Sequence, residues 1–240
     1  MENIATICDG FKSKLVSIRD VCDLVSRKPY CNVYDASCIL MIEKEFHRMN
    51  ESGRHSLNVY IAGPTCSGKT TFAEKVKEYF ERRASVTIIH QDDYFKDIKD
   101  IPRGPGGYYM DSKEAFHIDE LKRDFENLLA GEDVRVPNYD ISLNRRIGLK
   151  PIITRGKINI VEGLHVVDIF KEDKDGIFFY MNNPLESCLS RRISRDTKAI
   201  GVSKKRVEEY FEECIKPMYE KYILPQYRLM CIENYYKYIG

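Results

Sequence analysis

The 240-residue sequence has almost no net charge, because 38 lysine and arginine residues balance 37 aspartate and glutamate residues and leave a formal charge of +1. Proteins that bind nucleic acid or an anionic membrane usually carry a basic excess, so the charge balance argues against both as the main partner. No hydrophobic run approaches the ~20 residues that span a bilayer, so we expect no membrane span. The first residues, MENIATICDG, lack the basic and then apolar order of a secretory signal, so we expect a cytoplasmic protein.

The eight cysteines lack paired spacing, since no two of them form a C-x-x-C pair. Zinc sites are commonly built from such pairs, so the cysteines favour reduced thiols over a structural metal site. Hydrophobic residues make up 43% of the chain, which is enough for a packed core and argues against disorder.

Residues 1–56 are predicted to form a helical N-terminal extension. Apolar residues recur at helical spacing in two stretches, one that ends at Pro29 and one over 35–50. The positions on the two helical faces are Phe11, Leu15, Ile18, Cys22 and Val25 in the first stretch, and Ile39, Ile42, Phe46 and Met49 in the second. The extension carries no recognisable chemistry, and a dimer contact, a lid and a packing brace remain open as its role.

Residues 57–240 alternate between strand and helix patterns, which predicts a parallel sheet with helices on its faces. Short apolar runs predict strands at 57–63, 85–91, 158–163, 177–183 and 228–234. Helices are predicted over 70–83, 111–131, 183–196 and 203–223, with Asp111 as the N-cap of the second and Pro217 as a kink in the last. The runs 134–142 and 148–155, around a polar turn, predict a β-hairpin.

The stretch GPTCSGKT (63–70) matches G-x-x-x-x-G-K-[ST] at every fixed position, between a predicted strand and a predicted helix. Glycines let backbone N–H groups turn toward phosphate oxygens, and the following helix adds its positive end. Lys69 would bridge the β- and γ-phosphates of ATP, and the Thr70 hydroxyl would ligate Mg²⁺. The residues predicted here to bind the nucleotide are Gly63, Cys66, Ser67, Gly68, Lys69, Thr70 and Thr71.

Acidic residues follow two other predicted strands, Asp92 and Asp93 in HQDDYFKD and Glu162 in INIVEG. The carboxyl ends of parallel strands face the ligand crevice, where a carboxylate could accept a proton or hold Mg²⁺. Arg192 and Arg195 share a face of the predicted helix 183–196 and could reach a phosphate. A capped surface turn and a solvated helix face are the alternatives that these residues leave open on their own.

Taken together, these segments resemble the uridine kinase and phosphoribulokinase family of P-loop kinases from about residue 57 to 234. The segments that carry the resemblance, in order, are GPTCSGKTTFA, HQDDYFKD, YYMDSKEAFHIDEL, VPNYDIS, VEG, SRRISRD and IKPMYEKYILP. The resemblance implies an α/β P-loop kinase fold, with a five-stranded parallel sheet flanked by helices and a β-hairpin over the acceptor site. It also implies transfer of the γ-phosphoryl group of ATP, with Mg²⁺, to a primary alcohol, which is the 5′-hydroxyl in nucleoside kinases.

The resemblance also assigns roles to single residues. The matches are Asp92 as the catalytic base beside Lys69, Glu162 as the magnesium-linked glutamate, Asp111 and Tyr139 as acceptor-binding residues, Arg192 at the acceptor and Arg195 at the ATP phosphates.

Two departures from the family pattern affect the expected acceptor. In the hairpin, Ile141 stands where uridine kinases have an aromatic residue. Asn144 stands at the position of their base-reading histidine, so the resemblance implies that Asn144 contacts the acceptor. In the lid, Ile200 and Val202 stand where arginines would reach the nucleotide, so one of the cations at 204–206 would have to substitute.

We therefore expect an ATP-dependent kinase of a nucleoside, uridine or cytidine foremost. Another hydroxylated metabolite (nicotinamide riboside, a sugar or a pantothenate-like compound) and a nucleotide-binding regulatory protein with little kinase activity remain open. A kinase of nucleic-acid ends is disfavoured, because the balanced charge supplies no basic cleft. A homo-oligomer remains open as well.

Overall fold

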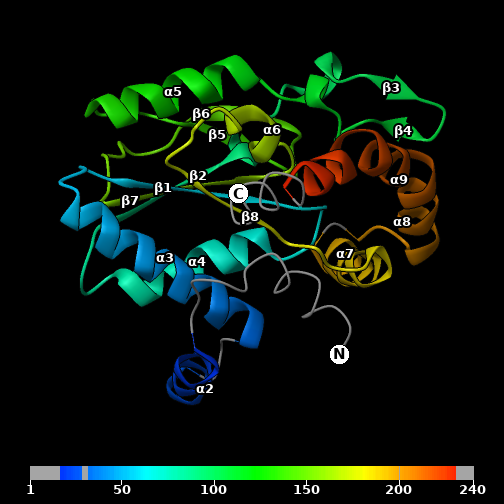
Figure 1. Cartoon of the computed structure of the whole chain (residues 1–240). Coiled ribbons are helices and arrows are strands. Elements are labelled where there is room, and N and C mark those ends of the chain that lie inside the picture. The colour runs from blue at the N-terminus through cyan, green and yellow to red at the C-terminus, as the bar shows by residue number, and fades with distance from the viewer. Residues whose placement is uncertain (1–16, 29–31, 200, 231–240) are drawn as a thin grey trace.

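A parallel β-sheet forms the centre of the computed structural model, which describes residues 17–28, 32–199 and 201–230 (Figure 1). Its four strands, in spatial order, are β2 (Val86–His90), β7 (Ile158–Gly163), β1 (Leu57–Ala62) and β8 (Ile177–Tyr180). In this register Ile61 and His90 both lie beside Glu162 of β7. The carboxyl ends of the strands therefore meet at one edge, which brings together the segments that follow them.

Side chains alternate between the two faces of the sheet, as the period of a strand requires. Val59 and Ile61 of β1 belong to a hydrophobic cluster with α3 (Val33–Glu51) and α4 (Lys69–Phe80). Tyr60 and Ala62 belong to a second cluster with α5 (Ile118–Ala130) and α6 (Val166–Phe170). Figure 1 shows α3 and α4 on one side of the sheet and α5 and α6 on the other. The α/β prediction with flanking helices is confirmed.

The predicted count of five strands is wrong for the described sheet, which has four. The expected fifth strand covers 228–234, but residues 224–230 are helical and 231–234 lie outside the described residues. The short run RLMCIEN suggests a strand when taken alone. With the preceding residues included, the buried positions Ile223 and Met230 and the half-buried Tyr227 between them follow helical spacing. These residues pack into the cluster that covers the sheet, and helical packing prevails.

The C-terminal part of the fold is a run of helices beside the sheet (Figure 1). Its members are α7 (Leu185–Ala199), α8 (Lys204–Tyr210), the π-helix η5 (Phe211–Ile215), α9 (Lys216–Met218) and the π-helix η6 (Tyr219–Ile223). The two π-helical segments lie on either side of Pro217, which has no N–H group to donate within the helix. The predicted irregularity at Pro217 thus takes the form of π-helical turns within a continuing helical segment.

Within residues 17–28, 32–199 and 201–230, two hairpins and three short 3₁₀ turns project from this frame. The strands β5 (Pro137–Asp140) and β6 (Arg145–Leu149) form the predicted hairpin, and the small strands β3 (Arg103–Gly104) and β4 (Gly107–Tyr108) form another. The 3₁₀ turns are η2 (Gln91–Tyr94), η3 (Ile98–Asp100) and η4 (Lys113–Ala115).

The prediction that Asp111 caps a helix over 111–131 is wrong at its start. The chain forms η4 and then an extended bridge between Phe116 and Phe95 before α5 begins at Ile118. Phe116 is 3% exposed and its ring stacks on Phe95 at 4.1 Å, so burial of the aromatic pair fixes this stretch outside the helix. The predicted end is confirmed, because Gly131 takes the left-handed conformation at the C-cap.

The helices α2 and α3, in the described part of the extension, lie on the α4 side of the sheet. In α2 (Ile18–Arg27), which ends before Pro29 as predicted, Val21 and Leu24 are buried while Cys22 is exposed, so the predicted buried face is displaced. Phe11 and Leu15 lie outside the described residues. In α3 the predicted face is confirmed, with Ile39 and Ile42 fully buried against the sheet and α4.

Polar contacts also join α3 to α4, the helix that follows the phosphate-loop motif. Lys75 of α4 pairs with the buried Asp35 of α3 at 2.6 Å. The Tyr79 hydroxyl donates to Glu43 at 2.7 Å. The extension thus shares one core with the following residues, and the domain boundary at residue 57 stays a prediction.

We expect Ile42→Ala to lower the free energy of unfolding by about 2–5 kcal/mol, since it leaves a cavity where α3 meets the sheet. Val33→Ala in the same helix is the matched control, because Val33 is 46% exposed and its truncation should change stability by less than about 0.5 kcal/mol. Urea unfolding of the three proteins measures both values. Equal stability of the Ile42 variant and the wild type would contradict the role of α3 in the core.

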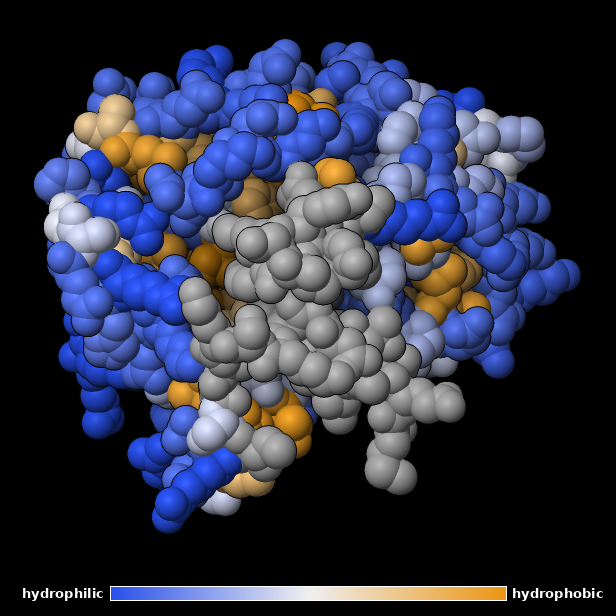
Figure 2. Space-filling view, in the orientation of Figure 1, coloured by the Kyte–Doolittle hydropathy of each residue, from blue (hydrophilic) through white to orange (hydrophobic). Residues whose placement is uncertain are grey.

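The surface in the view of Figure 2 is mostly hydrophilic, with hydrophobic residues in small separate areas. Within the described ranges, no helix combines the length and the apolar character needed to cross a bilayer. The five cysteines in that part of the chain carry thiols and form no disulfide.

Candidate active site

The loop between β1 and α4 has the backbone shape that the G-x-x-x-x-G-K-[ST] pattern predicts. Gly63 has φ +147°, and a Cβ there would lie 2.9 Å from the Met181 carbonyl oxygen and from the Ser67 hydroxyl. Gly68 has φ +97° at the N-cap of α4. Only glycine fits both demands without strain, so the sequence builds a tight loop that leads into a helix N-terminus.

The polar groups of this loop fit a phosphate chain. Lys69 is 9% exposed, and its Nζ donates to the Pro64 carbonyl at 2.9 Å, so the ammonium group curls over the loop. The Ser67 hydroxyl is buried without a hydrogen-bond partner among the described residues. Cys66 takes a left-handed conformation (φ +56°) at the turn of the loop. Thr71, the last predicted member, is exposed on the first turn of α4.

A second group of residues joins α4 to the ends of β2 and β7. The Thr70 hydroxyl donates to Glu162 Oε1 at 2.9 Å, and His90 Nδ1 lies 2.8 Å from the same oxygen. Burial alone would raise the pKa of Glu162, but the hydrogen bond from His90 and the positive charge of Lys69 outweigh it and hold the pKa below its usual value. The same hydrogen bond raises the pKa of His90.

This pair of oxygens fits Mg²⁺ in the manner usual for nucleotide enzymes, where one or two protein oxygens act together with phosphate oxygens. The part of the chain that the structure describes contains no cluster of three His, Cys, Asp or Glu side chains that would form a protein-only cage. Thr70 and Glu162, which the sequence predicts as metal ligands, lie within hydrogen-bond distance of each other. An ionised carboxylate beside a hydroxyl suits a hard cation.

The two adjacent acids after β2 occupy different environments. Asp93 is 6% exposed and pairs with Lys150 of the hairpin at 2.7 Å. The Asp92 residue is exposed, although many protein atoms lie around its carboxylate. Desolvation by these atoms and the negative charge of Glu162 raise the pKa of Asp92 to about 6. The structure thus leaves Asp92 as the candidate base and gives Asp93 a structural partner.

The predicted acceptor residues Asp111 and Tyr139 lie near Asp92, because charge on Asp92 acts on Tyr139 and charge on Asp111 acts on Asp92. Asp111 is 7% exposed; burial raises the pKa of its carboxylate, and the charges of Arg192 and Lys69 oppose that rise. The Tyr139 hydroxyl, on the inner face of the hairpin, is buried without a partner among the described residues. Burial raises the pKa of Tyr139 to about 12, with smaller contributions from Asp97 and Asp92. These groups leave polar atoms for a ligand to contact.

The arginines of α7 face the phosphate loop. Arg192 donates to the Thr65 hydroxyl at 3.1 Å and pairs with Asp196 at 3.1 Å. Arg195 also bonds Asp196, at 2.7 Å, and its charge reaches Asp111. A shared carboxylate therefore orients Arg192 and Arg195, and their roles at the acceptor and at the ATP phosphates stay predictions.

Comparison with known proteins decides the family. The sequence profile of the "Phosphoribulokinase / Uridine kinase family" matches residues 59–230. The chain belongs to the phosphoribulokinase/uridine kinase family. It is therefore a phosphotransferase with a hydroxyl group as acceptor, and the family implies the use of ATP.

Curated relatives carry the name uridine kinase. The uridine kinase of Aliivibrio salmonicida is 31% identical over 183 residues, which cover 72% of this chain and 83% of that protein. The uridine kinase of Vibrio cholerae is 32% identical over 176 residues, or 70% of this chain and 81% of that protein. "Uridine kinase-like protein 5" of Arabidopsis thaliana is 29% identical over 167 residues, which cover 69% of this chain but only 36% of that longer protein.

Solved structures of other kinases share the fold. A protein described as a fructose transport system kinase, from Silicibacter sp. TM1040, superposes with a TM-score of 0.57 at 16% identity, over 67% of this chain and 81% of that one. D-glycerate 3-kinase from Cryptococcus neoformans gives a TM-score of 0.55 at 13% identity, over 79% and 88% of the two chains. At these identities the likeness shows the P-loop kinase fold alone.

The hairpin of this family member does not bring Asn144 into the group of charged side chains. Asn144 is at the hairpin turn with φ +49°, and its carbonyl accepts a hydrogen bond from Ile98 at 3.1 Å. Asparagine tolerates this left-handed conformation better than most residues, so the turn itself explains the residue. The prediction that Asn144 contacts the acceptor stays a prediction.

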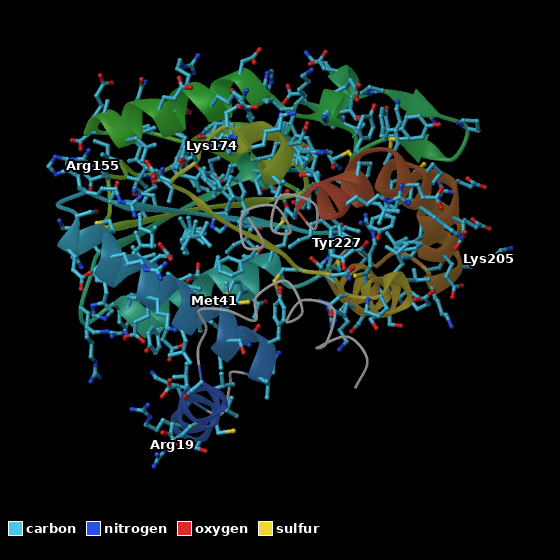
Figure 3. The ribbon with its side chains drawn as sticks, viewed as in Figure 1. Arg19, Met41, Arg155, Lys174, Lys205 and Tyr227 are labelled. Atoms are coloured by element: carbon cyan, nitrogen blue, oxygen red, sulfur yellow. The ribbon has the colours of Figure 1, made fainter. Side chains whose placement is uncertain are left out.

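In this family member Lys204, Lys205 and Arg206, the cations that follow the lid, do not lie over the phosphate loop. Lys204 and Lys205 are 69% and 87% exposed and pair with glutamates of their own helix at 3.6 and 3.8 Å. Figure 3 shows Lys205 on the outer side of α8, pointing away from the sheet. Arg206 donates to the Gly106 carbonyl at 3.1 Å in the β3–β4 turn. In this arrangement none of the three replaces the lid arginines that the family pattern leads one to expect at 200 and 202.

The structure adds contacts that the sequence did not reveal. Arg191, in the same run as Arg192, donates to the Cys66 carbonyl of the phosphate loop at 3.1 Å. His90 contacts Glu162, and its place at the end of β2, two residues before Asp92, was the available signal. The pairing of Lys150 with Asp93 joins segments 57 residues apart, so no local pattern could reveal it.

The pH dependence of the reaction should report Asp92. A base must be deprotonated to accept a proton. The pKa of Asp92, about 6, lies about two pH units above the usual pKa of an aspartate, so Asp92 becomes protonated at a correspondingly higher pH. We expect kcat/KM to fall roughly tenfold per pH unit below about pH 6 and to level off above it. Rates measured from about pH 4.5 to 8.5 give the profile, and a flat profile down to about pH 5 would contradict the raised pKa of Asp92.

Proposed function

We propose that the protein transfers the γ-phosphoryl group of ATP to the 5′-hydroxyl of a nucleoside, with uridine or cytidine as the best candidates. The position of Asp92 carries the proposal. The charges of Lys69 and Glu162 act on it from the nucleotide side, and that of Asp111 acts on it from the acceptor side. A base at the junction of two such groups is what transfer between a nucleotide and an alcohol requires.

The residues would divide the work by position. Asp92 would orient the attacking hydroxyl and accept its proton. Lys69 and Arg195 would neutralise negative charge on the phosphates, while Thr70 and Glu162 would hold Mg²⁺. Bound Mg·ATP supplies the phosphoryl group and the cation that balances its charge.

The acceptor side suits a molecule with several hydroxyl groups. The buried carboxylate of Asp111 can accept hydrogen bonds, and the Tyr139 hydroxyl can donate or accept one. Arg192 lies close enough to Asp111 for its charge to offset the rise in the pKa of Asp111. A ribose presents adjacent hydroxyls to such a pair. The uridine kinase relatives, similar over more than four fifths of their length, support the nucleoside as the acceptor.

One observation favours a second candidate, a kinase of a different hydroxylated metabolite. The hairpin tip carries Ile141 and Leu143, which are 55% and 53% exposed, and has no aromatic side chain to stack on a base. A smaller acceptor, such as a sugar or a pantothenate-like compound, would need no stacking. Nicotinamide riboside would keep the ribose contacts and change the base.

The test is ADP release with Mg·ATP against uridine, cytidine, purine nucleosides, nicotinamide riboside, pantothenate and sugars. A kcat/KM for uridine or cytidine at least tenfold above every other compound supports the first proposal. A stronger response to a compound without a nucleobase selects the second candidate. Calorimetric binding of ATP together with silence across the panel would contradict both and favour a regulatory nucleotide-binding protein.

A further inference from the structure

His165 is a buried histidine next to, but outside, the group of predicted site residues. It follows the segment VEGL at the end of β7 and precedes α6, and it is fully buried. A histidine in a hydrophobic core usually needs a reason, because its ring carries two polar nitrogens that must lose their water. Its contacts account for Nε2, whereas Nδ1 has no hydrogen-bond partner among the described residues.

Two hydrogen bonds tie His165 to both halves of the site. Its backbone N–H donates to Gln91 Oε1 at 2.8 Å, and Gln91 immediately precedes Asp92. Its ring nitrogen Nε2 lies 3.1 Å from the backbone carbonyl oxygen of Asp111. A carbonyl can only accept, so Nε2 carries the hydrogen and donates it. Burial lowers the pKa of His165 to about 3, so the ring is neutral at physiological pH.

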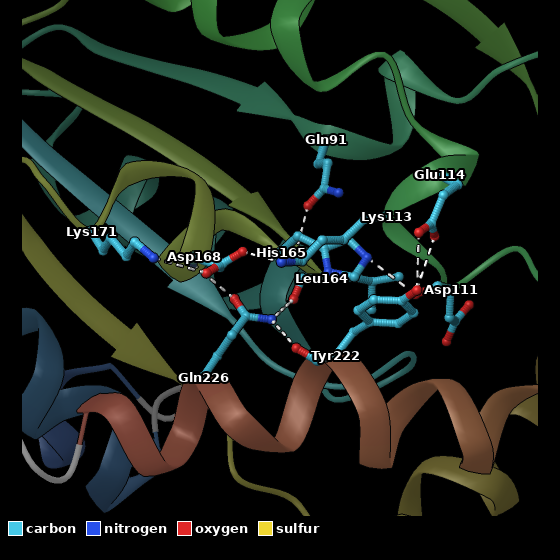
Figure 4. A network of polar contacts seen from close by, with 10 residues as sticks. All are labelled: Gln91, Asp111, Lys113, Glu114, Leu164, His165, Asp168, Lys171, Tyr222 and Gln226. Atoms are coloured by element: carbon cyan, nitrogen blue, oxygen red, sulfur yellow. Dashed lines mark hydrogen bonds and ion pairs between the residues drawn. The ribbon is translucent and has the colours of Figure 1, made fainter.

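The ring is held in place from several sides (Figure 4). Phe116 and Tyr222 meet it edge-on, with ring centroids 5.6 and 6.0 Å away. Gln226, on the same C-terminal helical segment as Tyr222, donates to the Leu164 carbonyl at 2.7 Å and fixes the backbone just before His165. The imidazole therefore has one orientation, and Nε2 points at Asp111.

The partner on the other side is equally constrained. Gln91 is fully buried and packs against Gly163, where an added Cβ would lie 2.3 Å from Gln91 Cβ and 2.4 Å from its Oε1. The glycine of VEG is thus required by the close approach of Gln91. Gln91, His165 and Asp111 form a rigid connection from the strand-end turn of Asp92 to the loop of Asp111.

We infer that His165 is a positioning residue for the acceptor: through Nε2–H it fixes the backbone of Asp111, so that the Asp111 carboxylate faces the acceptor hydroxyls at a set place relative to Asp92. The inference rests on the acceptor-binding role proposed for Asp111. A purely hydrophobic residue at 165 would fill the same space but leave the Asp111 carbonyl without this donor.

Two substitutions separate positioning from packing. In glutamine the terminal amide nitrogen is as many bonds from Cα as Nε2 is in histidine, whereas in asparagine it matches Nδ1. His165→Asn therefore removes the donor to Asp111, and His165→Gln retains a donor at the right reach. With uridine, or the acceptor chosen by the panel, we expect His165→Asn to raise the acceptor KM about tenfold, the usual worth of one hydrogen bond. The KM for ATP should stay within about twofold, and His165→Gln should restore the acceptor KM to within about threefold of the wild type.

The outcomes distinguish this inference from the proposed function. Equal losses in the Asn and Gln variants, or a parallel rise of both KM values, would show that His165 only packs. Asp111→Asn serves as the reference: if it raises the acceptor KM and His165→Asn does not, the inference alone is wrong. If Asp111→Asn has no effect, the acceptor role proposed for Asp111 fails, and the inference fails with it. His47→Asn, at an exposed position of α3, is the matched control and should change neither KM.

A second measurement needs neither a variant that folds nor a known acceptor. Nitrogen NMR of the wild-type protein reports which ring nitrogen of each histidine is protonated. We expect His165 to remain neutral with hydrogen on Nε2 between about pH 5.5 and 8, since its pKa is about 3. A neutral ring that carries its hydrogen on Nδ1 would leave Nε2 unable to donate to the Asp111 carbonyl and would overturn the inference.

Discussion

Asp92→Asn is expected to lower kcat by about 10²–10⁴-fold, the usual cost of removing a general base. The substitution keeps the shape of the side chain but removes its ability to accept a proton. Asp92 touches solvent, and no ion pair with it appears among the described contacts, so we expect the variant to fold as well as the wild type. ATP binding, measured by calorimetry, should persist, because the predicted nucleotide contacts come from the β1–α4 loop and α7.

Two neighbouring aspartates serve as controls. Asp100→Asn changes an exposed acid in the same loop and should leave both turnover and stability unchanged. Asp93→Asn removes the partner of Lys150 and should destabilise the protein, because Asp93 is buried and its loss leaves the charge of the half-buried Lys150 without this partner. Turnover within about tenfold of the wild type in the Asp92 variant would show that the base lies elsewhere, whereas a large loss only in the Asp93 variant would exchange the two roles.

The phosphate loop could be predicted from sequence because its physics is local. Gly63 and Gly68 are needed for backbone conformation, and Lys69 contacts the Pro64 carbonyl of the same loop. The four strands of the sheet and α4 could also be predicted from sequence, because apolar residues recur along each segment with the period of the element that it forms. The same argument explains the success for the hairpin and for the face of α3.

The wrong predictions concern segments whose structure depends on contacts with distant parts of the chain. The segment 228–230 is helical because preceding residues pack on the sheet, and the start of α5 is delayed because Phe116 stacks on Phe95. The separate fates of Asp92 and Asp93 depend on Lys150. No pattern within either segment contains that information.

The predicted site residues also differ in how far the sequence could place them. Asp111 was predicted from resemblance and proves to be buried, with the charges of Lys69, Arg192 and Arg195 acting on its carboxylate. The residue that holds its backbone, His165, carried no motif of its own. Such supporting residues are found only through contacts across the fold, here over 54 positions.

The second large effect is expected at Lys69, where replacement by alanine should lower kcat by about 10²–10³-fold or more. The ammonium group would balance the charge that develops on the transferred phosphoryl group, and no other cation of the described chain has a hydrogen bond to the Pro64 carbonyl at the turn of the loop. Lys77→Ala, at an exposed position on the same helix, is the matched control and should retain full activity. Unfolding of both variants near the wild-type midpoint would confirm that the loss is not structural.

Lys69→Ala should also change the pH dependence of the reaction, because Lys69 acts on Asp92. The positive charge of Lys69 lowers the pKa of Asp92, against desolvation and the negative charge of Glu162, which raise it. Without Lys69 that opposing influence is gone, so the residual activity of Lys69→Ala should show its acid inflection at higher pH than the wild type. An unchanged inflection together with a large loss of kcat would mean that Lys69 acts on the phosphates alone, and that Asp92 does not sense its charge.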